Sequence, residues 1–578
     1  MKDAALQTPV LIQIDMPSAA VDAEPEPARA VDAGAAQITA AALASSAAAT
    51  LAACGGGGGS APPPASPPTS FEASRFVAQS SMGADRTQIS SAQTLGYAAW
   101  IDAQFALPQS MSRCDWLVSQ GYDQAGVNNA NKNGLTGFDA CVWRKMFASP
   151  DTLRQRVTVA LSELLVVSIA GLSGSWRQFS GANYLDLLEN NAFGNYRTLL
   201  QQVSTSAAMG EYLTYRGNVK FNAANGAMPD ENYARELMQL FTIGLLQLNP
   251  DGTPALLNGV SQETYGLTDI TGLARVFTGW DWDLSVGAGS TPDFQRRPMI
   301  QVANRHETGA STFLGSTVGA GLDGAASLTA ALDIIFAHPN VAPFVSRQLI
   351  QRLVTSNPNP AYVQRVAAVF LNDGTGAKGN LKAVIKAILL DDEARNAQNL
   401  SSTSFGKLRE PMLRFVAWGR AFGATSPTDA WAIGDTSDPA TRLGQSPLRS
   451  PSVFNFFRPG YVPPTSVIAA ASLVAPEFQI TNETTMVGYL NYLQTAISNG
   501  VGDVKADYSA LVLLADNGQS LLDELNLVLA AGQISAATLA AMKAALDTMA
   551  SGSAVARNNR IYAALVMVMA DPGFLVQK

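Results

Sequence analysis

Two carboxylates and an arginine in the segment 229–244 have residue types and spacing that could do chemistry. Glu231 and Arg235 lie four residues apart and share one face of a helix, while Glu236 lies about a hundred degrees round from Arg235. A carboxylate that projects into a cleft can act as a general base or as a metal ligand, and a neighbouring arginine can hold it in place. Glu231, Arg235 and Glu236 are therefore candidate catalytic residues.

The chain has only two histidines, so every histidine-dependent mechanism must use one of them. His306 is followed by Glu307, and a histidine beside a carboxylate can act as an acid, a base or a metal ligand near neutral pH. A structural hydrogen-bonding role for His306 is the alternative. His338 precedes a proline, which favours a helix end, although a zinc site of both histidines and a carboxylate is conceivable. Arg275 completes the candidates, since it could meet one of the acids of the helix 231–244.

The acidic helix also has a structural interpretation. Glu231 suits the positive end of the helix dipole, and its pairing with Arg235 on a protein surface would be worth roughly a few tenths of a kcal/mol. The apolar residues of this helix, and those of the segment 269–280, recur at the spacing of a core-facing stripe. Gly279, directly before a tryptophan, predicts the close approach of another chain segment.

Several classes of protein are excluded by composition and by missing motifs. The His-Glu-x-x-His zinc motif, the phosphate loop G-x-x-x-x-G-K-[ST] and the nucleophile elbow G-x-S-x-G do not occur. Lysine and arginine total 38 against 46 acids, and no basic run stands out, so no nucleic-acid partner is expected. With 578 residues, 47% of them hydrophobic and only 15% charged, the chain can bury a large core.

Helices are the elements that must position these residues. We predict a mainly α fold, with one large helical domain over 71–578 and at most a small β-hairpin near 297–318. Ser149 is the predicted N-cap of the helix that runs through 153–165. The helical period marks the further segments 72–82, 87–106, 183–191, 195–204, 231–244, 269–279, 326–337, 341–354, 360–372, 380–390, 408–423, 482–499, 517–530, 535–550 and 556–569.

Residues 1–70 have a composition of their own. An uncharged, alanine-rich run ends in Leu-Ala-Ala-Cys54, which looks like a bacterial lipobox, where a signal peptidase cuts before a cysteine that receives a lipid. A Gly/Pro/Ser stretch typical of a tether follows. We predict a leader with a lipoprotein signal over 1–54, a tether over 55–70 and a location in the cell envelope, the periplasm or outside the cell, with a lipid anchor as the only membrane attachment. A disordered leader that is never processed is the alternative.

Two further features carry open alternatives. Cys114 and Cys141 could form a disulfide in an oxidising compartment, and two buried free thiols are equally compatible with the sequence. The stretch 450–465 carries four aromatic residues, one arginine and four prolines outside any helical pattern. It is either a loop packed over the core or an aromatic platform that faces a sugar or another planar or apolar ligand.

Motifs spread over most of the chain resemble the bacterial domain-of-unknown-function family 1800. PDENYARELM at 229–238 and LARVFTGW at 273–280 are similar to the family's E-N-[YF]-A-R-E-[LV]-[ML] and A-R-x-[FL]-T-G-W motifs. SRFVAQSSMG at 74–83, GKLREPMLR at 406–414 and SPSVFNFFRPGY at 450–461 resemble further family segments in the same order. The region around His306 is similar to the family's H-[DE]-x-G element, with Ser311 where that pattern often has lysine.

The resemblance implies a partner rather than a reaction. Members of this family have no settled activity, and they are often encoded beside the sulfatase-like family 1501. We therefore expect a cell-envelope binding or assembly partner of a sulfatase-like protein. The alternative is a hydrolase-like or metal-assisted enzyme whose cleft gathers Glu231, Arg235, Glu236, Arg275 and His306. Neither enzymatic activity nor a cofactor is assigned by the sequence.

Overall fold

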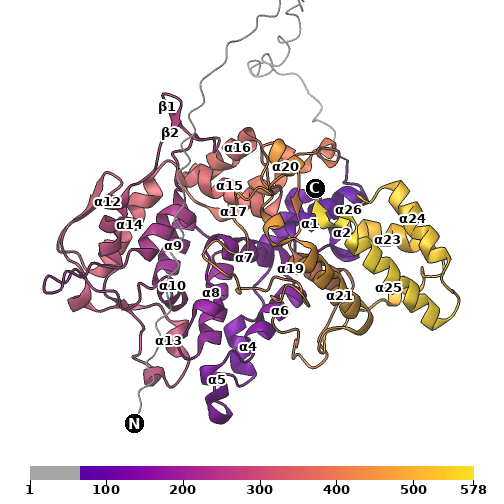
Figure 1. Cartoon of the computed structure of the whole chain (residues 1–578), viewed down its shortest axis with the longest axis horizontal. Helices are drawn as coiled ribbons and strands as arrows, with labels where there is room; N and C mark the ends of the chain where they lie inside the picture. Colours follow the sequence, from indigo (N-terminus) through magenta and orange to yellow (C-terminus); the bar gives the residue numbers. More distant parts are fainter. Residues whose placement is uncertain (1–65) are drawn as a thin grey trace, which may run out of the picture. The chain divides into compact units, whose positions relative to one another are not determined.

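Helices make up nearly all the regular structure of residues 66–578, the part of the chain that the computed structural model describes (Figure 1). Within that part there are 26 α-helices and four two-stranded sheets, so the predicted mainly α fold is confirmed. The predictions for the leader 1–54, for Cys54 and for the tether up to residue 65 lie outside the described residues.

The amino-terminal helices begin at local caps. At the first of them, the Thr69 hydroxyl accepts a hydrogen bond from the Glu72 amide, and the Glu72 carboxylate accepts one from the Thr69 amide, which completes a capping box. The helices of this part are α1 (Ser70–Ser80), α2 (Arg86–Leu95), α3 (Tyr97–Ala106), α4 (Arg113–Ser119), α5 (Ala130–Asn133), α6 (Phe138–Ala148), α7 (Thr152–Leu164), α8 (Arg177–Asn190), α9 (Tyr196–Thr205) and α10 (Ala207–Tyr212).

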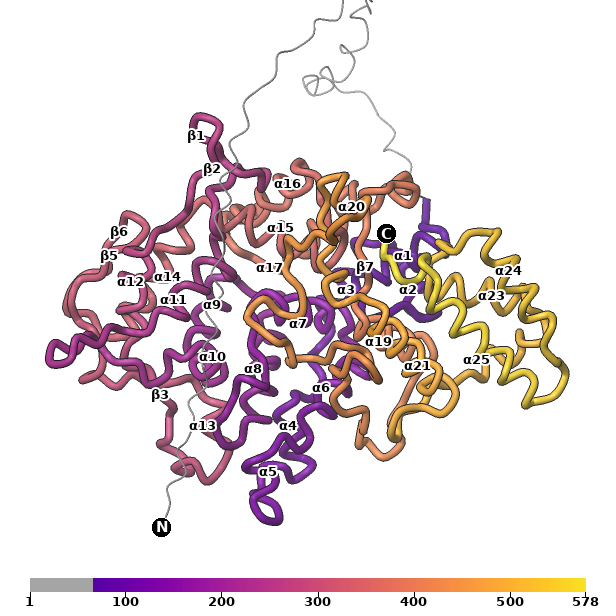
Figure 2. The backbone as a smooth tube through the Cα atoms, viewed as in Figure 1, coloured from indigo at the N-terminus to yellow at the C-terminus, as the bar shows by residue number. Residues whose placement is uncertain are grey.

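Helix α7 runs through the middle of this arrangement and packs against α3, α6 and α8 (Figure 2). Every residue of α7 except Ser162 is buried, and the buried ones include Arg156 and Glu163. The predicted N-cap is wrong by two residues, because Ser149 ends α6 and Asp151 is the N-cap of α7. Helix α7 therefore carries charged side chains into the core.

The acidic segment forms a shorter α-helix than the sequence predicts. Helix α11 (Asn232–Glu236) passes directly into a π-helical turn, η3 (Leu237–Thr242), where the Thr242 hydroxyl donates to the Leu237 carbonyl. Single π turns inside helices occur frequently at functional sites. After η3 the chain forms α12 (Leu267–Ala274), the 3₁₀ turn η4 (Arg275–Phe277) and α13 (Asp293–Arg296).

The carboxyl-terminal half returns to the amino-terminal helices, since α23 packs against α1 (Figure 2). His338 ends α14, as predicted, and Asn340 is the N-cap of α15. The remaining helices are α14 (Gly324–Ala337), α15 (Val341–Leu353), α16 (Pro360–Leu371), α17 (Leu381–Leu390), α18 (Asp392–Arg395), α19 (Pro411–Ala421), α20 (Val467–Ala470), α21 (Glu483–Asn499), α22 (Ser509–Val512), α23 (Gly518–Val528), α24 (Ala536–Asp547), α25 (Ala554–Ala570) and α26 (Pro572–Leu575).

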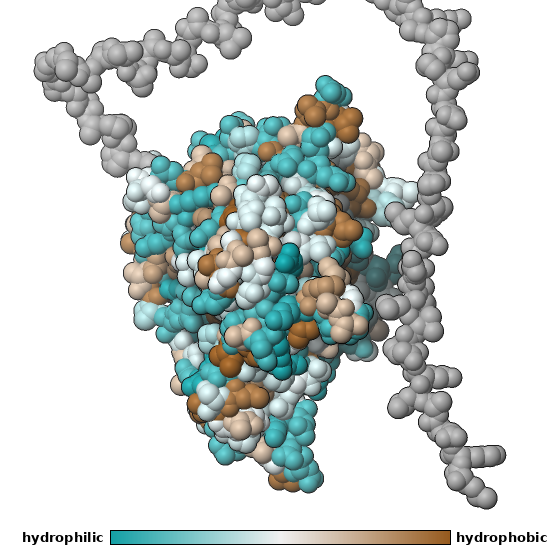
Figure 3. Space-filling view, turned by 90° about the vertical axis from the view of Figure 1, so that its left-hand side faces the viewer, coloured by the Kyte–Doolittle hydropathy of each residue, from teal (hydrophilic) through white to brown (hydrophobic). Residues whose placement is uncertain are grey.

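All four sheets are antiparallel pairs of short strands. The predicted hairpin is confirmed as β5 and β6, whose turn has positive φ at Leu314 (49°) and Gly315 (70°), as a type I′ turn requires. The hairpin β1–β2, at the top of the face in Figure 3, exposes three large apolar side chains. The strands are β1 (Leu256–Leu257), β2 (Val260–Ser261), β3 (Trp280–Asp281), β4 (Ile300–Gln301), β5 (Ser311–Phe313), β6 (Ser316–Val318), β7 (Lys407–Leu408) and β8 (Val576–Gln577).

A helix that spans a membrane must be both long and apolar. No single helix of residues 66–578 meets both requirements. Helices α14 and α15 meet them only when taken together, and that pair is bent by 80°.

Candidate functional site

Glu231 and Arg235 form a salt bridge at the start of α11, as their spacing predicts. Arg235 Nη2 lies 3.4 Å from Glu231 Oε2, and the Thr271 hydroxyl of α12 donates a 2.8 Å hydrogen bond to Glu231 Oε1. The side chains of Glu231 and Arg235 are 30% and 42% exposed. Water therefore screens the pair, and its contribution to stability is small.

His306 is buried and held at both ring nitrogens. Nδ1 lies 3.0 Å from the Thr278 carbonyl oxygen, and Nε2 lies 3.3 Å from the Ser327 hydroxyl. Because a carbonyl oxygen can only accept, Nδ1 carries the proton and Nε2 accepts from Ser327. Arg275 Nη2 lies 3.5 Å from a carboxylate oxygen of Glu307, the next residue along the chain. These contacts favour the structural interpretation of His306.

Glu236 is the candidate acid that lies inside the protein. It is 7% exposed, and its Oε2 atom has no hydrogen-bond partner among residues 66–578. Burial raises the pKa of Glu236, and the nearby guanidinium of Arg235 only partly offsets this. Over the same residues, no group of three or more His, Cys, Asp or Glu side chains is placed to hold a metal ion.

Gly279 allows the close chain approach that the sequence predicts. Its φ of +83° is in the left-handed region, and a Cβ at this position would lie 3.0 Å from the His306 amide nitrogen and from the Val302 carbonyl oxygen. These two neighbours are backbone atoms and cannot move aside cheaply, and the side-chain oxygen of Gln301 would lie closer still. The glycine therefore positions the segment that contains His306.

We expect Gly279→Ala to lower the free energy of unfolding by about 1–3 kcal/mol, because it adds both backbone strain and a steric clash. Urea denaturation measures the effect. Gly319→Ala is the matched control, since a Cβ there meets nothing within 4 Å and its φ is not in the left-handed region. Equal stability of the two variants would contradict the role assigned to Gly279.

An open cleft of about 650 Å³ lies elsewhere, between α15, the turn η3 with the loop that follows it, the end of α7 and the loop 453–462. None of the five predicted residues lines it. Its volume is in the range of ligand-binding pockets in proteins. This cleft is the candidate functional site.

One face of α15 forms a wall of the cleft. Phe344, Arg347, Gln348, Gln351 and Arg352 have the spacing i, i+3, i+4, i+7, i+8, which places all five on the same side of the helix, and all five line the cleft. The apolar residues on the other side of α15 are buried in the core. The helical period thus divides α15 into a core face and a cleft face.

The opposite wall is held by a single buried asparagine. Asn340 is fully buried, and its side-chain amide donates 2.8 Å hydrogen bonds to the carbonyl oxygens of Ile243 and Leu246. Its Oδ1 accepts a 2.9 Å hydrogen bond from the Leu248 amide. All three partners line the cleft. The N-cap of α15 therefore fixes the loop after η3.

The loop 453–462 combines the two roles that the sequence left open. Phe454, Arg458 and Tyr461 line the cleft, while Phe457 is buried. The Arg458 guanidinium lies over the Phe454 ring, 5.1 Å from its centroid, which is a cation–π distance. Part of the loop packs into the core, and part faces the cleft as an aromatic and cationic wall.

Glu163 is the sole acidic residue of the cleft lining, and a second buried carboxyl group, that of Glu410, lies near enough to influence it. Burial, and then the negative charge of Glu410, raise the pKa of Glu163 well above its usual range. Burial would raise the pKa of Glu410 too, but the positive charge of Lys407 holds it below its usual value. Folding therefore favours protonation of Glu163 more than protonation of Glu410.

Lys407 lies beside two buried acids, Glu410 and Glu477, and offsets their negative charge. Its Nζ lies 3.0 Å from a carboxylate oxygen of Glu477 and 3.7 Å from one of Glu410, and it donates a 2.9 Å hydrogen bond to the Arg352 carbonyl oxygen. The lysine and both acids are almost fully buried. Burial raises the pKa of Glu477, and Lys407 opposes that rise.

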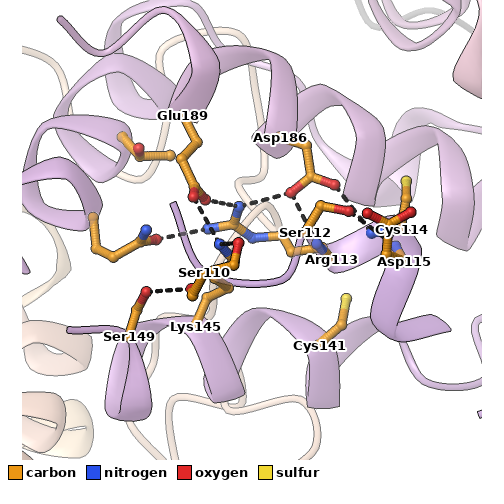
Figure 4. A network of polar contacts seen from close by, with 12 residues as sticks. Ser110, Ser112, Arg113, Cys114, Asp115, Cys141, Lys145, Ser149, Asp186 and Glu189 are labelled. Carbon is orange, nitrogen blue, oxygen red and sulfur yellow. Dashed lines mark hydrogen bonds and ion pairs between the residues drawn. The ribbon is translucent and has the colours of Figure 1, made fainter. Parts of the chain in front are cut away.

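A second buried ionic network joins α4, α6 and α8 (Figure 4). Arg113 Nη1 lies 3.0 Å from Asp186 and 2.7 Å from Glu189, and Lys145 Nζ lies 2.7 Å from Glu189. Arg113 also lines an internal chamber of about 30 Å³, and Glu163 belongs to the lining of both that chamber and the open cleft. Glu163 and Arg113 of this network therefore border the same small chamber.

Cys114 and Cys141 lie beside that network as separate thiols (Figure 4). Both cysteines are buried and free, so the structure has two separate thiols and not a disulfide. Burial raises the pKa of both thiols, which disfavours the reactive thiolate.

Sequence reasoning missed Glu163, Arg347 and Arg352. The signal for the two arginines was present, since polar residues recur at helical spacing within the apolar segment 341–354. Glu163 gives no such signal. In the sequence it stands among apolar residues, as a surface acid of an amphipathic helix also does.

Comparison with known proteins extends these observations. A family model described as "Protein of unknown function (DUF1800)" matches residues 75–576, which include nearly all the helices and the whole of the cleft. No curated protein matches the chain, and no solved structure matches it.

Proposed function

Because the chain belongs to the DUF1800 family, whose members are proteins of unknown function, we propose from its own geometry that it is a binding protein of the cell envelope whose open cleft holds a ligand. The observation that carries this proposal is the cleft itself, with a volume of about 650 Å³ and walls that mix apolar and polar side chains. The residues that we considered for catalysis lie outside it.

The location and the partner in this proposal rest on the sequence. The Leu-Ala-Ala-Cys54 segment and the Gly/Pro/Ser stretch after it support export and attachment through a lipid. The family resemblance supports a sulfatase-like protein as the partner. In this proposal the sulfatase-like protein does the chemistry, and the present chain binds and assembles.

The test is purification of the tagged full-length protein from membranes of its native host. We expect it to bring down a sulfatase-like protein in comparable amounts, identified by mass spectrometry, and we expect Cys54→Ala to move the complex out of the membrane fraction. Absence of any sulfatase-like protein would remove the partner, and absence of lipid on Cys54 would remove the anchor.

The hydrolase-like or metal-assisted alternative has one supporting observation. The buried carboxyl group of Glu236 has an unpartnered oxygen and a raised pKa, which is typical of a group that exchanges protons. Its other candidates are engaged elsewhere, since Glu231 pairs with Arg235, Arg275 with Glu307, and His306 with Thr278 and Ser327. A hydrolytic activity of the purified protein that Glu236→Gln abolishes would favour this alternative over a binding role.

A further inference from the structure

Three arginines share the open cleft with one carboxyl group. Arg347 and Arg352 come from α15 and Arg458 comes from the loop 453–462. Over residues 66–578, neither Arg347 nor Arg458 forms a salt bridge, and the pKa of Arg347 is lowered by burial, with no opposing effect of a carboxylate. Arg352 lies 3.9 Å from Glu163, and its Nε atom has no hydrogen-bond partner there. The cleft therefore holds guanidinium groups with unused donors.

The one acid of the cleft does not compensate these charges. Glu163 forms a salt bridge with Arg352 alone, at 3.9 Å, and the neighbouring buried acid Glu410 is 3.7 Å from Lys407. Gln445 also donates a 2.7 Å hydrogen bond to Glu410. A low-dielectric cleft lined by charge of one sign attracts an ion of the opposite sign. The missing partner is an anion, which guanidinium groups bind through charge-assisted hydrogen bonds.

The remaining walls of the cleft are apolar and partly open to water. Phe344, Leu246 and Phe454 line it, and Leu246 is 37% exposed. Leu245 and Val462, at 56% and 38% exposed, extend this apolar surface at the same cleft. Exposed apolar side chains that line one concave site are typical of a surface that a ligand covers.

We propose that the cleft binds an amphiphile whose anionic head group is held by Arg347, Arg352 and Arg458. Its apolar part lies against Phe344, Leu246 and Phe454. This inference rests on the proposed function, that the cleft is a ligand-binding site, and adds the class of ligand. A phospholipid head group and a small soluble amphiphile with a sulfate, phosphate or carboxylate share this chemistry.

The first experiment compares probes that share an eight-carbon chain and differ in the charge of the head group. Octyl sulfate, octyl phosphate, octanoate and octanol are titrated calorimetrically into the purified full-length protein at concentrations where each probe is monomeric. We expect the three anions to bind at least about tenfold more tightly than octanol, because octanol cannot use the guanidinium donors. Raising the salt concentration should weaken only the binding of the anions.

The second experiment removes the cations one at a time. Arg347→Gln and Arg458→Gln should each weaken octyl sulfate binding by about tenfold and leave octanol binding unchanged. Arg557→Gln is the control, since it removes an arginine from an exposed ion pair with Asp516 that does not line the cleft. Unchanged circular dichroism of the variants separates a loss of binding from a loss of fold.

A third experiment distinguishes the two sources of the ligand. Displacement of octyl phosphate by dihexanoyl phosphatidylglycerol, but not by dihexanoyl phosphatidylcholine, would support an anionic lipid. Displacement by neither would support a smaller anionic amphiphile.

Two results would overturn the inference, and they differ in what they say of the proposed function. Binding of octanol and octyl sulfate with equal affinity would leave a ligand-binding cleft and remove the anionic class. Binding of no probe would contradict the cleft as a ligand site as well as the inference.

Discussion

Replacing Glu189 by alanine is expected to lower the free energy of unfolding by about 3–5 kcal/mol. Glu189 receives charge-assisted contacts of 2.7 Å from both Arg113 and Lys145, and all three side chains are at most 3% exposed (Figure 4). Removal of the acid leaves the lysine without its carboxylate, and Arg113 keeps Asp186 as its one carboxylate partner. A buried charge without a partner is among the most costly defects in a folded protein.

Guanidinium denaturation at neutral pH measures this loss. The matched control is Asp333→Ala, which removes a carboxylate that is 64% exposed and pairs with Arg197 on the surface. We expect a change of less than about 1 kcal/mol for the control, because water and salt screen exposed pairs. A similar small change for Glu189→Ala would show that the buried network does not stabilise the fold.

The contribution of Glu189 should depend on pH in a defined direction. Burial alone would raise the pKa of Glu189, but Arg113 and Lys145 hold it below its usual value. An acid whose pKa is lowered by folding binds protons more readily in the unfolded chain. Its stabilising effect is therefore fully present above the unfolded pKa, near 4.3, and is lost as the pH falls through the lower folded pKa. The stability gap between the native protein and Glu189→Gln should shrink in acid.

Replacing Lys407 by methionine is the second substitution with a large expected effect, again about 3–5 kcal/mol. Methionine keeps much of the volume of lysine but removes the charge that lies between Glu410 and Glu477. It also removes the donor to the carbonyl oxygen of Arg352, near the end of the helix that forms the cleft wall. The two buried carboxylates then lose the one cation that lies within 4 Å of them in residues 66–578, while Arg156 and Arg414 act on them only from further away.

The loss of unfolding free energy caused by Lys407→Met should grow as the pH rises. The pKa of Glu477 is already raised by burial, and removing Lys407 removes the main influence that lowers it. For an acid whose pKa is raised by folding, the protonated form is the one that the folded state favours, so stability is retained at low pH and lost as the pH rises through the folded pKa. Chemical denaturation at pH 5 and pH 8 measures the difference.

Lys543→Met is the control for this prediction, because it removes a lysine from an exposed i, i+4 pair with Asp547. We expect little effect on stability at either pH. If the stability of Lys407→Met were independent of pH, the neutralising role of Lys407 between Glu410 and Glu477 would be wrong.

Local features of the chain were predictable because they depend on short-range physics. The helical period located most of the helices, and the close approach at Gly279 and the helix end at His338 were confirmed. The N-cap at Ser149 was wrong, since Ser149 and Asp151 both suit a cap and only the neighbouring helix α6 decides between them. The π turn after Glu236 was also missed, because its sequence continues the apolar period of an α-helix.

The site could not be predicted in the same way. For Glu231 and Arg235, the spacing predicted their contact, but the same pattern occurs on ordinary solvated helix surfaces. The loop 450–465 supported two interpretations, and the structure has both, with Phe457 in the core and Phe454 at the cleft. A sequence pattern does not say which side of a loop faces a cavity.

The sequence by itself determined the mainly α fold and the membership in the DUF1800 family. Only the tertiary structure decided which charged residues matter. It brings Glu163 of α7 beside Arg352 of α15 and Glu410 at the start of α19, residues far apart in the chain. The physical reason is that burial and proximity set both the pKa of Glu163 and the availability of the arginines. Neither quantity is a property of a residue type or of its neighbours in sequence.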